Sequence, residues 1–395
     1  MGTAQTQRNY TGFALLSGGF RPFFLGAGLF ALAAIAIWPA VFSGEVQLPT
    51  TFAAVTWHSH EMLFGFGGAV IAGFLLTAIP NWTGRLPVAG TMLCALTLLW
   101  LAGRAAVLCA AMTGWATAMV IDVAFLVVFS MVVGREVLAG RNWRNLKVII
   151  LVLLLALTNL SFHLEAQFHG AAEYSARAAL AITVFLILLI GGRVVPSFTG
   201  NWLARRGETR PVPFNRLDAV LLVASAIALL AWIIFPEAEL TGILLLAGGA
   251  GSLLRLARWR GWRTLADPLV LVLHVAFLFT ALGFLAAGIH ALWPDVLPAP
   301  VGLHIWAIGS IGLMTLAMMT RATLGHSGHA LAASRGTQLV YVLVTLALVA
   351  RLGMALLPEW SVDLMWAAAV AWSLGFIGFI AIYGPMLCRR RADGR

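Results

Sequence analysis

Long apolar runs separated by short polar connections dominate the chain. Each run is about 18–25 residues long, the length that a helix needs to cross a hydrocarbon layer of about 30 Å. Because backbone groups in lipid must be hydrogen-bonded within the protein, runs of this length predict helices rather than barrel strands. We expect an all-α polytopic membrane protein forming a single membrane domain, residues 1–395. Its twelve predicted spans are residues 21–42, 57–79, 88–109, 115–134, 147–166, 177–197, 217–235, 240–257, 267–290, 301–320, 336–357 and 362–388.

The composition agrees with the pattern. Hydrophobic residues make up 61% of the chain and charged residues only 10%, which leaves too little polar surface to cover a water-soluble globule of 395 residues. The first span has no small-residue cleavage site, so we expect no removed signal peptide. The lipid bilayer is therefore the first predicted partner.

The basic residues are concentrated in alternate connections between the predicted spans. The chain has 25 Lys and Arg against 15 Asp and Glu. Most of the basic residues lie near the start of the first span (Arg8, Arg21), in alternate connections, or in the C-terminal tail. The connections 43–56, 110–114, 236–239, 291–300 and 358–361 contain none. This positive-inside pattern places both termini in the cytoplasm and explains the net charge of +10 without a nucleic-acid partner.

Two motifs suggest an internal repeat. The segment RNWRNL at 141–146 resembles RGWRTL at 260–265, which begins 119 residues later. The cytoplasmic ends of spans 2, 6 and 10 each carry a polar residue, five further residues and then Ser/Thr-Gly, ending at Gly84, Gly200 and Gly328. We predict three tandem four-helix repeats, roughly 20–140, 141–262 and 263–388, which are parallel because the span count of each is even.

Histidines gather at the external side of the predicted bundle. Counting 24 residues back from Gly84 and from Gly328 gives His60 and His304, so these two occupy equivalent helix entries. The external layer of candidate metal ligands is His58, His60, His163 and His304. Imidazoles projecting from several helices are the usual way in which a bundle builds a metal site. Without a nearby thiolate, imidazoles suit copper, iron or zinc.

His58 and His60 point about 200° apart on a regular helix, so we expect them to have different roles. Glu61 follows His58 by three residues and is the candidate carboxylate that fixes a ring tautomer beside the metal. Glycines on the same span, Gly65 and Gly73 among them, allow a helix or a flat cofactor to approach closely. The plainer interpretation is that histidines near a membrane surface are simply hydrated.

A second group of candidates lies nearer the cytoplasm. His274 is an ionisable residue inside span 9 and a candidate axial haem ligand, with a helix-to-helix hydrogen bond as the structural alternative. His326 is a candidate ligand or propionate contact. Arg193 and Arg321 either pair with haem propionates or extend toward the membrane surface. Arg104, Asp122 and Arg351 lie inside spans as candidate structural partners.

Several motifs resemble the NnrS family, bacterial polytopic membrane proteins of the nitric-oxide response. They are GFRPFF (19–24), WHSHEMLFGF (57–66), GFLLTAIPNWTG (73–84), RNWRNL (141–146), GGR (191–193) and MTRATLGH (319–326). The resemblance implies a multi-pass protein of the bacterial inner (plasma) membrane with haem and copper cofactors. It also implies nitric oxide or another small diatomic ligand as a partner, an electron donor, and a role in nitrosative-stress defence. The matching positions are His58, His60, Glu61, His163, Arg193, His274, His304, Arg321 and His326.

The resemblance implies no settled reaction, so three functions stay open. The first is a haem/copper metalloprotein that binds or turns over nitric oxide, an oxidoreductase if it is catalytic. The alternative is a secondary transporter of a metal or metal complex, favoured by twelve spans, internal repeats and helix breaks expected at Pro80 and Pro196. The third is a sensor or assembly factor. A haem–copper oxidase is disfavoured because no adjacent His-His pair occurs.

Overall fold

The computed structural model describes residues 10–392, which form helices and no strand. Within residues 10–392, twelve helical spans are long and apolar enough to cross a membrane, which confirms the predicted count and fold class. Large apolar side chains such as Leu98, Leu157 and Val220 point outward, as lipid-facing residues do. The spans are Phe20–Phe42 (α2), Ala54–Thr83 (α3, η2, α4), Gly90–Leu108 (α5), Trp115–Ala139 (α7), Trp143–His169 (η3, α8), Glu173–Ala204 (α9, η4, α10), Arg216–Ile234 (α11), Glu239–Arg258 (α12), Pro268–Leu292 (α13), Ala299–His326 (α14, η6, α15), Arg335–Leu356 (α16) and Pro358–Cys388 (η7, α17).

Spans 2, 6 and 10 each contain a π-helical segment. These segments are η2 (Glu61–Phe66), η4 (Ile187–Gly191) and η6 (Ile305–Gly312), so each predicted repeat has one. The wider π turn is uncommon and is frequent at functional sites. By contrast, the breaks expected at Pro80 and Pro196 do not occur. Both prolines lie inside continuous helices, α4 (Gly67–Thr83) and α10 (Gly192–Ala204), as membrane helices permit.

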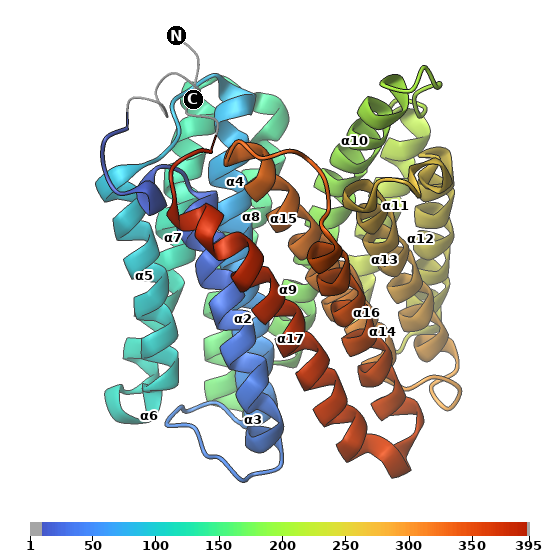
Figure 1. Cartoon of the computed structure of the whole chain (residues 1–395). Coiled ribbons are helices and arrows are strands. Elements are labelled where there is room, and N and C mark those ends of the chain that lie inside the picture. Colours follow the sequence, from blue (N-terminus) through green and yellow to red (C-terminus); the bar gives the residue numbers. More distant parts are fainter. Residues whose placement is uncertain (1–9, 393–395) are drawn as a thin grey trace. The chain divides into compact units, whose positions relative to one another are not determined.

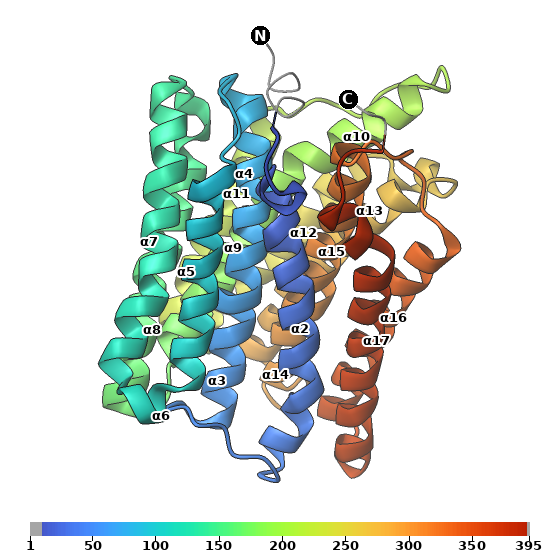
Figure 2. The ribbon, with the colours of Figure 1, turned by 60° about the vertical axis from the view of Figure 1, so that its left-hand side comes forward.

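The chain forms two compact units, here called unit 1 and unit 2. The described part of unit 1 is residues 10–179, 319–330 and 376–392. Its helices α2, α4, α5, α7 and α8 lie side by side (Figures 1 and 2). Close approach is possible where the contact residue is glycine: a Cβ on Gly73 would lie 2.7 Å from the Phe24 ring, and one on Gly103 would lie 3.0 Å from Asp122 Oδ1.

The two ends of the described chain meet in unit 1. The Arg21 guanidinium donates from Nη1 to the carbonyls of Leu387 and Arg389, at 2.9 and 2.5 Å, where α17 ends. The Arg390 side chain donates to the Thr11 carbonyl at 3.2 Å. An even number of spans places both ends on the same side of the membrane. The cytoplasmic assignment of the ends stays a prediction, and Arg8 and Arg395 lie outside the described residues.

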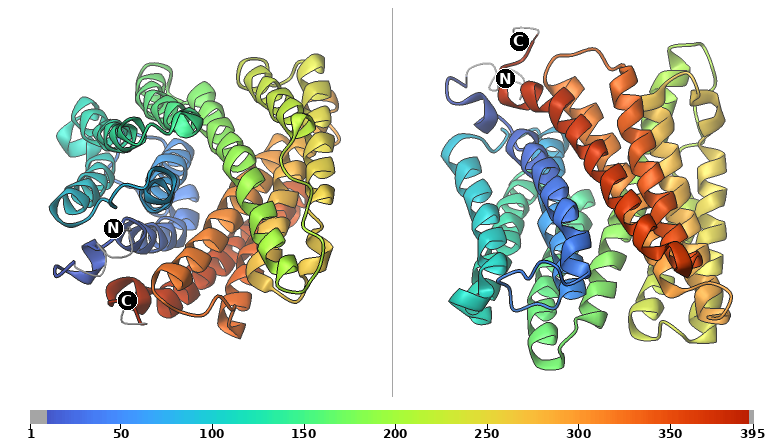
Figure 3. Two further views of the ribbon diagram at one scale, coloured as in Figure 1. Left: turned by 90° about the horizontal axis from the view of Figure 1, so that it is seen from above. Right: turned by 60° about the horizontal axis from the view of Figure 1, so that its bottom comes forward.

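Unit 2 comprises residues 180–318 and 331–375. Helix α12 packs against both α11 and α13; the three are drawn in yellow-green to amber in Figure 3. Glycines of α12 again permit close packing, since a Cβ on Gly249 would lie 2.6 Å from Leu285 of α13. Trp306 of η6 is fully buried and contacts Trp232 and Phe284 at ring-centroid distances of 5.0 and 5.1 Å. The three tandem repeats stay a prediction.

Candidate metal centre

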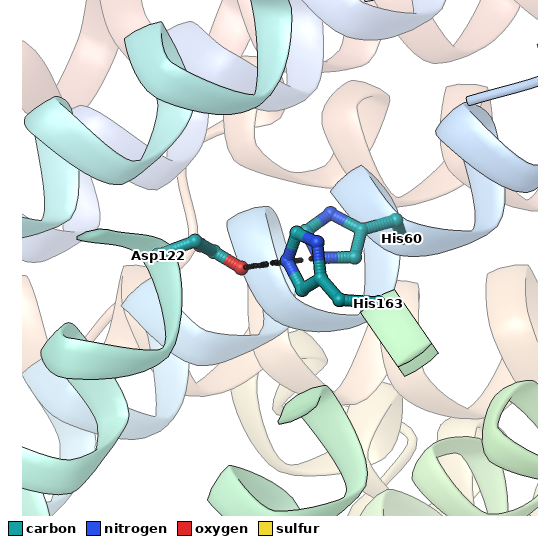
Figure 4. Close-up of side chains that lie close together, drawn as sticks. All are labelled: His60, Asp122 and His163. Atoms are coloured by element: carbon teal, nitrogen blue, oxygen red, sulfur yellow. Dashed lines mark hydrogen bonds and ion pairs between the residues drawn. The ribbon is translucent and has the colours of Figure 1, made fainter. Parts of the chain in front are cut away.

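Three helices of unit 1 bring two imidazoles and one carboxylate together. His60 ends α3 (Ala54–His60), Asp122 lies on α7, and His163 lies on α8 (Leu146–His169). Asp122 Oδ2 is 3.1 Å from His60 Nε2 and 3.1 Å from His163 Nε2 (Figure 4). All three candidate ligand atoms lie within 4.8 Å of one another. The convergence of His60 and His163, predicted from their membrane depth, is present in this unit.

An arginine links the two carboxylates of the cluster. Arg104 of α5 donates from Nη1 to Glu61 Oε1 at 2.6 Å and from Nη2 to Asp122 Oδ1. Gly65 makes room for this bridge, because a Cβ there would lie 2.8 Å from Arg104 Nη1 and 3.1 Å from Glu61 Oε2. The Gly65 carbonyl, inside the π segment, accepts a hydrogen bond from the Trp100 indole at 3.0 Å. The π segment is thus tied to the charged cluster and to α5.

The ring of His60 faces hydrogen-bond acceptors at both nitrogens. Nδ1 is 2.9 Å from Glu61 Oε1, and Nε2 is 3.0 Å from Asn159 Oδ1 and 3.1 Å from Asp122 Oδ2. Asn159 presents its oxygen here because its amide nitrogen donates to Asp122 Oδ2 at 2.8 Å. A neutral imidazole has only one N–H, so this environment calls for a second ring proton or for a cation at Nε2.

The charge balance of the cluster also calls for an additional positive charge. Glu61 and Asp122 carry two negative charges, whereas Arg104 carries one positive charge, and neutral imidazoles add none. Glu61, Asp122 and His60 are 2%, 1% and 0% exposed, and Arg104 is 7% exposed. An uncompensated charge is costly to bury, above all within a membrane span. The cluster therefore has the charge and the donor atoms to hold one cation.

Aromatic rings enclose the two imidazoles. Phe52 lies 5.1 Å from the His60 ring and 5.2 Å from the His163 ring, measured between centroids. Phe64 and Phe162 also pack on His60, at 5.1 and 5.2 Å. The His60 and His163 rings are themselves 4.9 Å apart and near perpendicular. Such a shell excludes water and strengthens the electrostatic interactions inside it.

His58 lies outside the described cluster and stacks on the Trp38 ring, with centroids 4.2 Å apart and planes 21° apart. The expected pairing of Glu61 with His58 is wrong, because Glu61 binds His60. The chain changes from α to π winding at Glu61, so the regular three-residue spacing to His58 no longer decides which ring the carboxylate meets. The role foreseen for Glu61, a carboxylate that orients a histidine, remains with His60 as its partner.

The fourth predicted ligand, His304, belongs to unit 2. It is the last residue of α14 (Ala299–His304), directly before η6, and its Nδ1 lies 2.8 Å from the Pro300 carbonyl. Its position matches that of His60 directly before η2, as the repeat register predicts. A shared site for the two histidines stays a prediction.

His274 in unit 2 forms a hydrogen bond to a neighbouring helix, and its role as a haem ligand stays a prediction. The Thr199 hydroxyl donates to the Val195 carbonyl at 2.9 Å, so His274 Nε2, at 2.8 Å, donates to Thr199. The other nitrogen, Nδ1, has no hydrogen-bond partner and faces Gly261, where a Cβ would lie only 2.5 Å away. The helix-to-helix hydrogen bond that the sequence offered as the alternative to haem ligation is therefore present, between α13 and α10.

The remaining predicted cofactor contacts are partly buried and fall in different units. His326 and Arg321, on α15 (Leu313–His326), belong to unit 1, and Arg193 on α10 belongs to unit 2. The His326 ring packs on Phe20 at 5.4 Å, and its carbonyl accepts from Arg391. The haem roles of these three residues stay predictions.

Sequence reasoning noted Asp122 and Arg104 only as structural partners and overlooked Asn159. The sequence nevertheless contained a signal for each of these three residues. Two opposite charges inside neighbouring spans must be compensated within the protein. Asn159 precedes His163 by four residues, which places both side chains on one face of α8.

Fold and cluster together define a polytopic α-helical membrane protein with a buried imidazole–carboxylate centre suited to a metal ion. The family described as NnrS protein matches residues 14–391, nearly the whole described chain. The chain therefore belongs to the NnrS family and is a membrane protein of the nitric-oxide response. Searches among curated proteins and among solved structures found no match.

Proposed function

We propose that the protein is a copper-containing protein of the bacterial inner membrane that binds or processes nitric oxide or nitrosyl species in nitrosative-stress defence. Copper would be held by His60 Nε2, His163 Nε2 and a carboxylate oxygen of Asp122. The observation that carries the proposal is the convergence of these three atoms within 4.8 Å in a buried, negatively charged cluster.

The donor set and the charge both support copper. Two imidazoles and one carboxylate suit copper, iron and zinc, and they form no hard all-oxygen cage for magnesium or calcium. The surplus of one negative charge is neutralised by a monovalent ion, and copper has a stable monovalent state. Copper bound there would supply a one-electron redox centre within reach of a diatomic ligand. Haem is also implied by the family resemblance, but His274 Nε2 is hydrogen-bonded to Thr199 and Nδ1 faces Gly261, so we propose copper alone.

The neighbouring side chains would hold the ligands rather than bind the ion. Glu61 accepts the His60 Nδ1 proton and thereby directs the Nε2 lone pair toward Asp122. Asn159 donates to Asp122 Oδ2 and fixes the orientation of that carboxylate. Arg104 balances the two carboxylates while leaving one negative charge for the metal ion.

The aromatic enclosure suits an apolar diatomic ligand. Nitric oxide enters lipid readily, so a centre lined by Phe52, Phe64 and Phe162 needs no polar channel to receive it. An electron donor would be required for turnover and not for binding alone.

The test is the response of the purified protein to nitric oxide. After the bound copper is oxidised to copper(II), we expect the electron paramagnetic resonance spectrum of the protein in detergent to show coupling to imidazole nitrogens. The spectrum should change when nitric oxide is added anaerobically. His163→Ala should abolish both features. His169→Ala is the matched control, because His169 is exposed at the end of the same helix. A nitric-oxide response that persists unchanged in a folded His163→Ala variant would refute the proposed centre.

A further inference from the structure

Unit 2 buries a cluster with the opposite charge. Arg255 and Arg258, at the end of α12, flank a single carboxylate, Asp218 of α11. Arg255 Nε is 3.4 Å from Asp218 Oδ1, and Arg258 Nη1 is 3.2 Å from Asp218 Oδ2. Arg255 is 1% exposed and Asp218 is 3% exposed, whereas the Arg258 side chain at the end of the helix is 16% exposed. Two guanidinium groups against one carboxylate leave one positive charge uncompensated in this cluster.

Asp218 also serves its own helix. Its Oδ2 accepts the Asn215 backbone N–H at 3.1 Å, while the Asn215 side chain accepts the Asp218 backbone N–H, which completes a capping box at the start of α11. Part of the acceptor capacity of the carboxylate is therefore used for the cap.

The hydrogen bonding of Arg255 is incomplete. Of its three guanidinium nitrogens, Nη2 donates to the Leu188 carbonyl of the π segment η4 at a long 3.4 Å, and Nε makes the 3.4 Å ion pair with Asp218. Nη1 has neither a hydrogen bond nor an ion pair. Three residues earlier on the same face of α12, the buried Ser252 hydroxyl also lacks a partner. Two buried donors without acceptors thus lie beside a surplus positive charge.

The surroundings leave only the edge of the guanidinium available. Trp259 and Phe277 lie 5.5 and 5.8 Å from the Arg255 guanidinium carbon, measured to their ring centroids. Gly192 admits the group, because a Cβ at that position would lie 2.1 Å from Nη2. With rings beside the guanidinium, a further partner must be an acceptor near its N–H edge, as planar oxyanions are.

We propose that unit 2 binds a small monovalent oxyanion at Arg255, with the chemistry of a carboxylate or of nitrite. Its oxygens would accept from Arg255 Nη1 and from the Ser252 hydroxyl, and its charge would neutralise the cluster. A water molecule would satisfy one donor but would leave the positive charge buried. The inference rests on unit 2 alone and is independent of copper in unit 1. Two sources share this chemistry, a free anion and a carboxylate on a molecule that copurifies with the protein.

Thermal unfolding of the purified full chain tests the proposal. Sodium formate and sodium nitrite are titrated against sodium chloride at equal ionic strength. We expect Tm to rise with the logarithm of formate or nitrite concentration and not with chloride. Arg255→Met should weaken the apparent affinity at least about tenfold, as expected for losing a hydrogen bond to a charged group. Arg263→Gln removes the same charge from an exposed position, 60% exposed, and should match the wild type.

Ser252→Ala provides a second variant if Arg255→Met fails to fold, and it should weaken formate binding while leaving the cluster charge intact. If the oxyanion belongs to a copurifying molecule, formate will not change the wild-type Tm. Unfolding will then release a carboxylated compound whose amount falls in Ser252→Ala and Arg255→Met. An absence of both the anion-dependent Tm and a released anion, or their persistence in folded Arg255→Met, would overturn the proposal.

Discussion

In unit 1, Glu61 and Asp122 face a single guanidinium, whereas in unit 2 Arg255 and Arg258 face a single carboxylate. Both clusters are buried within or at the ends of membrane spans. Both contact a π segment, and both fit because a glycine makes room for an arginine, Gly65 in one case and Gly192 in the other.

The difference lies in the sign of the surplus charge. Unit 1 has one negative charge too many and adds two imidazoles, the donors that transition metals prefer. Unit 2 has one positive charge too many and adds N–H and O–H donors. The same packing device therefore produces a centre suited to a cation in one unit and a centre suited to an anion in the other.

Removing Arg104 should break the unit 1 cluster most severely. Arg104→Met leaves two buried carboxylates without their shared counter-charge, which costs about 3–5 kcal/mol of stability when a buried ion pair loses one partner. Thermal unfolding in detergent measures the loss. Arg85→Gln is the control, since Arg85 pairs with Glu136 but is 43% exposed. Equal Tm values for the two variants would show that the Arg104 bridge is not required for the fold.

Asp122→Asn should abolish the preference of unit 1 for a cation. The change keeps the shape of the side chain, removes one negative charge, and takes away the carboxylate ligand. We expect copper affinity to fall by more than about 100-fold, beyond the loss that a residue merely supporting a ligand produces. Competition titration with a copper(I) chelator measures this. Asp363→Asn, at an exposed position, should have no effect, and an unchanged affinity in Asp122→Asn would remove Asp122 from the ligand set.

The twelve spans were predictable because hydropathy and length alone decide whether a segment crosses a membrane. His60 and His163 were predictable as neighbours in depth, because rise along a helix converts sequence position into height. Asp122 was not recognised as a candidate ligand, since sequence position does not tell which face of α7 meets α3 and α8. Nor was the π winding at Glu61 predictable, because it depends on tertiary contacts such as the Trp100 hydrogen bond to Gly65.

Glu61→Gln should have a smaller effect on copper than Asp122→Asn. Glutamine still accepts the His60 Nδ1 proton but carries no charge, so the His60 ring keeps its orientation while the ligand becomes less basic. We expect a loss of about 10- to 100-fold in copper affinity. Glu173→Gln, 74% exposed in the same unit, is the matched control. A loss as large as that of Asp122→Asn would indicate that Glu61 itself binds the ion.

Asp218→Asn should strengthen anion binding by the unit 2 cluster. The amide oxygen still accepts the Asn215 N–H, so the start of α11 is preserved, while the positive surplus of the cluster doubles. Formate should then bind several-fold more tightly, and the formate-dependent rise in Tm should begin at lower concentration. Weaker formate binding in this variant would mean that Asp218, rather than the anion, governs the position of Arg255.

The copper centre proposed for unit 1 consists of one ion held by His60, Asp122 and His163. The most direct measurement is the copper(I) stoichiometry and affinity of the purified protein, determined by chelator competition for the wild type, His163→Ala and His169→Ala. We expect one tightly bound ion in the wild type and in His169→Ala, and its loss in His163→Ala. Tight binding of one ion by folded His163→Ala, or no binding by the wild type, would contradict it.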